Sequence, residues 1–185
     1  PMALYNAVRY NYGAQKGCTL VIDIGARATN LVFIEEGRFF SRNLPVIGTG
    51  NAITQQLMKE FNIPFKDAEE LKLAHASVAF GGAYEDYDDM VISRVSKTVR
   101  NAITRLHVEV ERSINFYRTQ QNGVKPARVL LAGGTSAIAR MDQFFKEKLK
   151  IDDVSYLNSF KNIFVSRSVS DDEVASSAHF MGAVV

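Results

Sequence analysis

The chain has 185 residues, 46% of them hydrophobic, a length that suits one domain or two small subdomains sharing a core. Its 22 basic and 20 acidic residues give a net charge of +2 and form no basic stripe, so we expect no nucleic acid partner. Its one cysteine, Cys18, excludes an internal disulfide, and no apolar run approaches the ~18–20 residues that span a bilayer, so we expect a cytoplasmic protein without direct membrane insertion.

Three strands are expected first. Residues 18–24 (CTLVIDI) form a nearly continuous apolar run, which is typical of a buried central strand. A tight turn at 25–28 leads to a second strand at 29–35. The dipeptide Glu36-Gly37 then predicts a hairpin turn into a third strand at 38–44. The three strands are therefore expected to form an antiparallel meander.

The next stretch is predicted to be helical. Asn51 is expected to cap a first helix, and Pro64 to begin a second one over residues 65–75. Residues 80–89 (FGGAYEDYDD) contain two glycines and four acidic residues, which indicates a surface loop. A long helix follows, whose apolar residues recur at three- and four-residue steps with one step of seven: Val91, Val95, Val99, Ala102, Leu106, Val110 and Tyr117.

The remainder alternates between strands and helices. Residues 127–132 (ARVLLA) predict another buried strand, and the turn Gly133–Ser136 is expected to run directly into a helix. A short strand is predicted at 153–157, and residues 170–173 form a capping box before a last helix. The predicted fold class is α/β: a mixed sheet, an antiparallel meander plus parallel strands, flanked by helices, with a helical insert.

Two glycine turns at strand ends carry the chemistry. In the first, Gly25 allows a tight turn whose N–H groups can point at one anion, and Asp23 can hold a hydrated magnesium ion. In the second, Gly133 and Gly134 allow a flat ring or a ribose to approach the backbone. Each turn alone is more often ordinary tight packing. Their order along the chain, with a helical insert between them, favours a shared ligand.

That order resembles the second half of the RNase H-like, actin-like ATPase fold of actin, sugar kinases and heat-shock chaperones. Within this superfamily, residues 21–61, 66–72, 113–120 and 130–149 are similar to the PilM family, the actin-like component of type IV pilus assembly. The first stretch reads VIDIGARATNLVFIEEGRFFSRNLPVIGTGNAITQQLMKEF and the last LLAGGTSAIARMDQFFKEKL. The cell-division protein FtsA is a relative that shares both glycine turns.

The resemblance implies how the chain is divided and what it binds. Residues 1–50 and 127–185 would form subdomain IIA, and residues 51–126 would form the inserted subdomain IIB. In the complete protein, ATP with Mg²⁺ would occupy the cleft, and Asp23 would hold the metal through water. The implied ligand contacts run from the phosphates through the ribose to the base: Asp23, Gly25, Ala26, Arg27, Thr29, Asn30, Glu69, Lys72, Gly133, Gly134 and Thr135.

The resemblance also implies partners. These are the cytoplasmic tail of a PilN-like inner-membrane protein and pilus motor and assembly proteins, which would place the chain peripherally at the inner membrane. Because the facing phosphate loop of the superfamily has no counterpart here, we expect weak ATPase activity at most and none from the isolated chain, and no catalytic residue is assigned. Three alternatives stay open: a degenerate actin-like scaffold without nucleotide, favoured by Arg27 and Ala28, an FtsA-like cell-division protein, and half of a sugar or acetate-type kinase.

Overall fold

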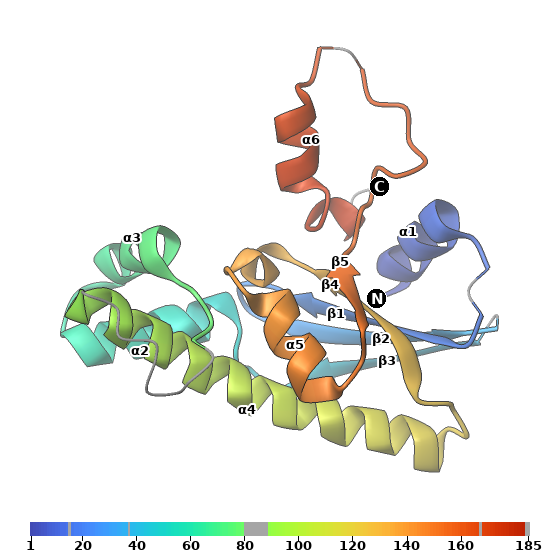
Figure 1. The fold of residues 1–185 in the computed structure, drawn as a ribbon, viewed down its shortest axis with the longest axis horizontal. Helices are drawn as coiled ribbons and strands as arrows, with labels where there is room; N and C mark the ends of the chain where they lie inside the picture. Colours follow the sequence, from blue (N-terminus) through green and yellow to red (C-terminus); the bar gives the residue numbers. More distant parts are fainter. Residues whose placement is uncertain (15, 37, 80–88, 167, 184–185) are drawn as a thin grey trace.

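A five-stranded mixed sheet forms the centre of the molecule (Figure 1). The computed structural model describes residues 1–14, 16–36, 38–79, 89–166 and 168–183. The strands are β1 (Cys18–Ile24), β2 (Thr29–Glu35), β3 (Arg38–Leu44), β4 (Pro126–Ala132) and β5 (Asp153–Tyr156), in the spatial order β3-β2-β1-β4-β5. β1, β2 and β3 pair antiparallel, whereas β4 is parallel to β1 and β5 to β4. The predicted meander with added parallel strands is confirmed.

The sheet is buried on both faces, which explains its continuous apolar strands. Successive residues of β1 alternate between two core clusters: Leu20 and Ile22 join one cluster, and Val21 joins the other. The larger cluster contains side chains from α4 (Met90–Gln120) and α5 (Met141–Leu149). The smaller cluster contains Leu4 and Val8 of α1 (Met2–Tyr12). Figure 1 shows α4 and α5 on one side of the sheet and α1 on the other.

The insert between β3 and β4 consists of three α-helices in the part of the chain that the structure describes: α2 (Gly50–Phe61), α3 (Phe65–His75) and α4. The long helix is confirmed, and its C-terminal half packs on the sheet, where the rings of Tyr117 and Phe33 stack 4.4 Å apart. One core cluster runs through both insert and sheet. The division into subdomains at residues 51 and 126 stays a prediction.

Several local predictions need correction. α1 was not expected. α2 begins two residues earlier than expected, with Thr49 rather than Asn51 at the N-cap position. The turn after β4 does not run directly into an α-helix. It forms a short 3-10 helix, η1 (Gly134–Ala137), and α5 begins only at Met141, after Arg140 adopts a left-handed conformation with φ 66°.

The C-terminal segment contains a short helix, α6 (Asp171–Ser177), and a 3-10 turn, η2 (Met181–Ala183). The capping box predicted at its start is present, with the Ser170 hydroxyl and the Glu173 carboxylate satisfying each other's backbone N–H. The loop predicted at residues 80–89 lies outside the described residues except for Asp89, which caps α4 by accepting from the Val91 and Ile92 N–H groups. Gly37 of the predicted hairpin turn also lies outside them.

Candidate functional site

The two glycine turns meet at one edge of the sheet. β1 and β4 are parallel neighbours, and Asp23 pairs with Ala132, so both turns leave the sheet at the same end. The carboxyl end of parallel strands is where open α/β sheets bind ligands. The turns are also bonded directly, because the Thr135 hydroxyl donates to the Gly25 carbonyl at 3.1 Å. The geometric condition for one ligand to touch both turns is therefore met.

The N-terminus of α2 joins the same junction. The Gly50 N–H donates to the Gly25 carbonyl at 3.1 Å, and the Asn51 N–H donates to the Ala26 carbonyl at 2.8 Å. Gly50 is required here, since a Cβ atom at this position would lie 2.8 Å from the Thr135 hydroxyl oxygen. The β1–β2 turn, the start of α2 and the start of η1 are thereby held as one unit.

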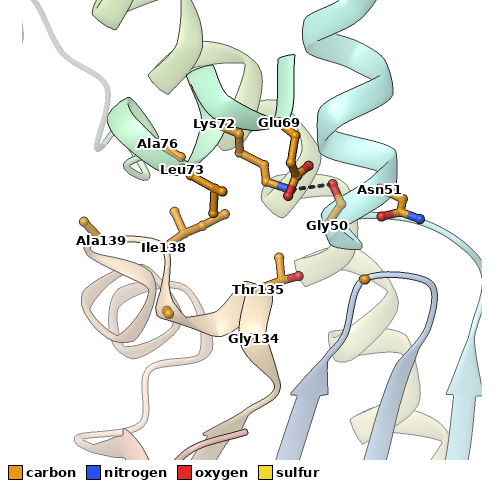
Figure 2. A pocket seen from close by; sticks show the side chains of 12 residues that line it. Gly50, Asn51, Glu69, Lys72, Leu73, Ala76, Gly134, Thr135, Ile138 and Ala139 are labelled. Carbon is orange, nitrogen blue, oxygen red and sulfur yellow. Dashed lines mark hydrogen bonds and ion pairs between the residues drawn. The ribbon is translucent and has the colours of Figure 1, made fainter. Parts of the chain in front are cut away.

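An open cavity of about 560 Å³ lies above this junction, between the insert and the sheet (Figure 2). The apolar part of the lining includes Leu73 and Ile138, whose side chains point toward each other in Figure 2. The polar wall includes Glu69 and Lys72. The remaining lining residues come from four segments: Ala26, Gly50, Asn51, Ala76, Gly134, Thr135, Ala137 and Ala139. An apolar slot beside a few fixed polar groups is the usual form of a small-molecule site.

Glu69 and Lys72 form an ion pair on the polar wall, with Lys72 Nζ 2.7 Å from Glu69 Oε2. Lys72 is buried, at 7% exposure, and also donates to the Thr54 hydroxyl at 2.9 Å and the Gly50 carbonyl at 3.2 Å. Burial alone would raise the pKa of Glu69, but hydrogen bonds from Lys72 and Thr54, together with the Lys72 charge, hold it below its ordinary value. Glu69 is thus ionised at neutral pH.

Asp23 lies at the end of β1, beneath the Gly133 turn. Burial raises the pKa of its carboxyl group, and a hydrogen bond from the Asn30 amide at 3.2 Å offsets part of that rise. Asn30 is itself oriented by Asn43, whose amide donates to the Asn30 carbonyl oxygen at 2.9 Å. Among the described residues no basic side chain is bonded to Asp23, and a half-buried carboxylate of this kind is a group that a cation would stabilise.

Gly133 allows β4 to approach Asp23. Its φ is +83°, and a Cβ atom there would lie 2.5 Å from the Ile24 carbonyl oxygen and 2.6 Å from Asp23 Oδ1. Its N–H donates to the His179 carbonyl at 3.0 Å, which ties the turn to the C-terminal segment. Gly134 differs, because no atom lies within 4 Å of a Cβ atom built there and it faces the cavity.

The structure brings most of the predicted site residues together but not all. Ala26, Glu69, Lys72, Gly134 and Thr135 line the cavity, and Asp23, Gly25, Asn30 and Gly133 lie at or beside the junction beneath it. Two predicted contacts lie apart from the cavity. Arg27 is exposed on the turn, and Thr29 is fully buried at the start of β2.

The predicted set omits seven of the twelve residues that line the cavity: Gly50, Asn51, Leu73, Ala76, Ala137, Ile138 and Ala139. Gly50 was assigned to the break after the third predicted strand, Asn51 to a helix cap and Ile138 to a helical face, whereas Leu73 was not singled out. Leu73 carried no signal in the sequence, because its 76% exposure is known only from the structure. Ile138 carried none, since its position depends on the break between η1 and α5.

The site has donors for a hydrated divalent cation but not for a cage of protein ligands. Among the described residues no group of three His, Cys, Asp or Glu side chains could hold a metal ion. Mg²⁺ commonly keeps several waters and uses one or two carboxylates together with substrate phosphates. The single carboxylate of Asp23 fits that arrangement.

The sheet order, the two bonded turns and the cavity between insert and sheet define an actin-like ATPase fold. A sequence profile of the family "Type IV pilus assembly protein PilM" matches residues 3–184. This chain therefore belongs to the PilM family.

Solved structures agree on the fold. A structure titled "PilM-PilN type IV pilus biogenesis complex" is 21% identical with a TM-score of 0.74, and the match covers 98% of this chain and 48% of that one. Ethanolamine utilization protein EutJ from Carboxydothermus hydrogenoformans is 20% identical with a TM-score of 0.61, covering 99% and 52%. MreB5 of Spiroplasma citri bound to ADP is 22% identical with a TM-score of 0.56, covering 84% and 54%. The chain thus spans about half the length of these structures.

Along the described part of the chain, no helix has the length and apolar character needed to cross a membrane.

Proposed function

We propose that this chain is the nucleotide-binding half of a protein that scaffolds type IV pilus assembly, with Mg-ATP bound in the cavity between the insert and the sheet. The observation that carries the proposal is the Gly25 carbonyl, which accepts hydrogen bonds from both α2 and the Gly133–Thr135 turn. Three segments distant in sequence converge there beneath a cavity of about 560 Å³, a volume within the range of small-molecule sites.

In this arrangement the flat base lies in the apolar slot between Leu73 and Ile138, and the ribose lies next to Glu69. The phosphates extend toward the Gly25–Ala26 turn, where Asp23 holds Mg²⁺ through water. When bound, the cation would neutralise part of the phosphate charge. The chain's own residues position the nucleotide, because the turns and the Glu69–Lys72 pair are already fixed by hydrogen bonds.

This half supplies one side of the site. The solved relatives are about twice as long as this chain. Micromolar affinity corresponds to about −8 kcal/mol and millimolar affinity to about −4 kcal/mol. Solvent-exposed contacts at a helix terminus contribute only about 0.3–1 kcal/mol each. We therefore expect the isolated chain to bind Mg-ATP with millimolar affinity and not to hydrolyse it.

Replacing Asp23 separates a functional carboxylate from a structural one. Burial raises the pKa of Asp23, so the folded state disfavours its ionised form at pH 7, and Asp23→Asn is expected to leave the free energy of unfolding unchanged or slightly higher. The same variant should weaken Mg-ATP binding about 10- to 100-fold, the usual loss at a metal's supporting groups. Titration of the isotope-labelled chain with Mg-ATP, followed by nuclear magnetic resonance (NMR), compares the two proteins: the wild-type shifts should approach saturation at millimolar Mg-ATP, and those of the variant should not.

Asp152→Asn is the matched control for this titration. Asp152 is fully exposed and lies just before β5, at the opposite end of the parallel strands. The Asp152→Asn variant should bind Mg-ATP with the same affinity as the wild type. Equal affinities for wild type and Asp23→Asn would remove Asp23 from the site and favour the scaffold that does not use nucleotide.

The proposed protein partner is the cytoplasmic tail of a PilN-like membrane protein. A solved structure similar to this chain is titled as a PilM-PilN complex, which supports the proposal. Pull-down with the cytoplasmic segment of the membrane protein, using a protein that contains both halves of the fold, tests it. Retention that changes on adding Mg-ATP would support a nucleotide-regulated scaffold, and no retention in either condition would contradict the partner.

A further inference from the structure

Lys72 has no donor left for a ligand. An ammonium group has three N–H donors, and the three acceptors around Lys72 Nζ are Glu69 Oε2 at 2.7 Å, the Thr54 hydroxyl at 2.9 Å and the Gly50 carbonyl at 3.2 Å. All three belong to the protein. Figure 2 shows the side chain of Lys72 directed toward Glu69 and Gly50. The amine is therefore engaged within the wall of the cavity.

Glu69 differs from Lys72 in this respect. Its Oε2 atom accepts from Lys72 and lies 2.5 Å from the Thr54 hydroxyl, whereas its Oε1 atom has no partner among the described residues. The side chain of Glu69 is one-third exposed and lines the cavity. One carboxylate oxygen is thus available to accept a hydrogen bond from a sugar hydroxyl.

The Lys72 bond to Gly50 connects the cavity wall to the phosphate turn. Gly50 receives the Lys72 bond on its carbonyl oxygen and donates its own N–H to the Gly25 carbonyl. The adjacent Asn51 N–H donates to Ala26. A continuous path of hydrogen bonds therefore runs from Glu69 through Lys72 and Gly50 to the backbone of the β1–β2 turn.

We propose that Lys72 is a positioning residue that fixes the α2 N-terminus on the Gly25–Ala26 turn, while Glu69 alone of the pair contacts the ligand's sugar hydroxyls. For its ligand, this inference rests on the proposed nucleotide function. The role of Lys72 in the nucleotide-free protein does not depend on that function, so the two can fail separately.

Hydrogen exchange of the nucleotide-free chain tests the positioning role directly. Lys72→Met keeps most of the side-chain volume and removes the three hydrogen bonds. The Gly50 and Asn51 amides are expected to exchange at least about tenfold faster in this variant, while amides in the centre of β1 keep their rates. Lys66→Met, which changes an exposed lysine of the same helix, should leave all these rates unchanged. Wild-type rates for Gly50 and Asn51 in Lys72→Met would overturn the proposal.

A second variant covers the case in which Lys72→Met does not fold. Thr54→Val removes the hydroxyl that bridges Lys72 and Glu69, and that also bonds the Gly50 carbonyl at 2.9 Å, without changing any charge. We expect faster exchange of the same two amides in Thr54→Val. Unchanged rates there would also contradict the positioning role.

Sugar analogues then separate Lys72 from Glu69. NMR titrations with Mg-ATP and with its 2′-deoxy and 3′-deoxy analogues give the ratio of analogue to ATP dissociation constants. Lys72→Met should weaken ATP and its analogues by the same factor, about fivefold or more, and leave the ratios unchanged. In Glu69→Gln at least one ratio of analogue to ATP dissociation constants should fall toward 1, because the hydroxyl contact is weakened. The control Glu70→Gln, which changes an exposed neighbour, should leave the ratios unchanged.

The opposite pattern would assign the hydroxyl contact to Lys72. A variant Lys72→Met that binds a deoxy analogue as tightly as the wild type does, but binds ATP more weakly, would overturn the proposal. If the wild type binds none of the nucleotides, the proposed function fails and so does the ligand role of Glu69. The exchange rates of Gly50 and Asn51 still decide whether Lys72 positions α2.

Discussion

Gly133 is the residue that allows the end of β4 to lie close to Asp23 and Ile24 of β1. Its positive φ and the short distances from a built Cβ atom to Ile24 and Asp23 leave no space for a side chain. Gly134, one residue later, has an ordinary φ and open space around it. The two glycines of one motif therefore have different roles: the first permits the turn, and the second leaves room in the cavity.

Alanine at each position should separate these roles. Gly133→Ala is expected to lower the free energy of unfolding by about 2–3 kcal/mol, because a left-handed backbone and a clash with the Ile24 carbonyl combine. Gly134→Ala should change it by no more than about 0.5 kcal/mol. Urea unfolding of the two variants measures the difference. Equal stabilities would show that the Gly133 backbone relaxes without cost.

The sequence predicts the Gly133–Gly134 turn because a glycine pair after a buried apolar run is a local signal. It does not predict the role of Lys72, since the Gly50 carbonyl it binds is 22 residues away and is set by how α3 packs on α2. It also misses Leu73 as a cavity wall, because the exposure of a helical residue depends on what lies opposite. Chemistry within a motif was predictable from sequence, whereas contacts between motifs were not.

At the level of elements, Glu35 ties the β2–β3 hairpin to the end of α4. Its Oε2 atom accepts from the Val124 N–H and the Tyr117 hydroxyl, both at 3.0 Å, and its Oε1 atom accepts from Arg38 at 2.7 Å. The hydrogen bond from the Val124 N–H lowers the pKa of Glu35 below its ordinary value of 4.5, and the bonds from Arg38 and Tyr117 lower it further. Burial acts in the opposite direction but is outweighed. This tie lies at the opposite end of β2 from the cavity.

The tie predicts a pH dependence of stability. A carboxyl group whose pKa is lower in the folded state stabilises the fold above its unfolded pKa, and this contribution is lost as the pH falls through the folded pKa. Between pH 7 and pH 3, Glu35→Gln should therefore lose less stability than the wild type, by about 1–3 kcal/mol. Urea unfolding at both pH values tests this. The exposed neighbour Glu36→Gln is the control, and a pH dependence in Glu35→Gln equal to that of the wild type would contradict the tie.

Elements with a strong period or a continuous apolar run were predictable from sequence. β1, β2 and β3 match their predicted bounds, and α4 follows its heptad-like spacing. α1 was missed because its buried face is short, with only Leu4, Ala7 and Val8 before the polar Asn11. The late start of α5 was missed because Arg140 is in a left-handed conformation, which no local signal predicts.

At the scale of the whole molecule, the insert and the sheet together form the cavity in which we propose that the nucleotide binds. Their relative position is fixed near the cavity by Val78, whose N–H donates to the Ala139 carbonyl at 3.0 Å, and by the parallel bridge between Ser77 and Ala139. The apolar slot between Leu73 and Ile138 lies beside these contacts. This chain therefore forms the cavity without the other half of the fold. We expect its affinity for Mg-ATP to be low.

Joint binding by the two glycine turns is the central claim, and a single NMR titration of the labelled chain with Mg-ATP tests it most directly. The amides of residues 25–28 and of Gly133–Thr135 should shift together and give one dissociation constant, because one nucleotide contacts both turns. Shifts confined to one turn, or two turns that titrate with different constants, would contradict the account.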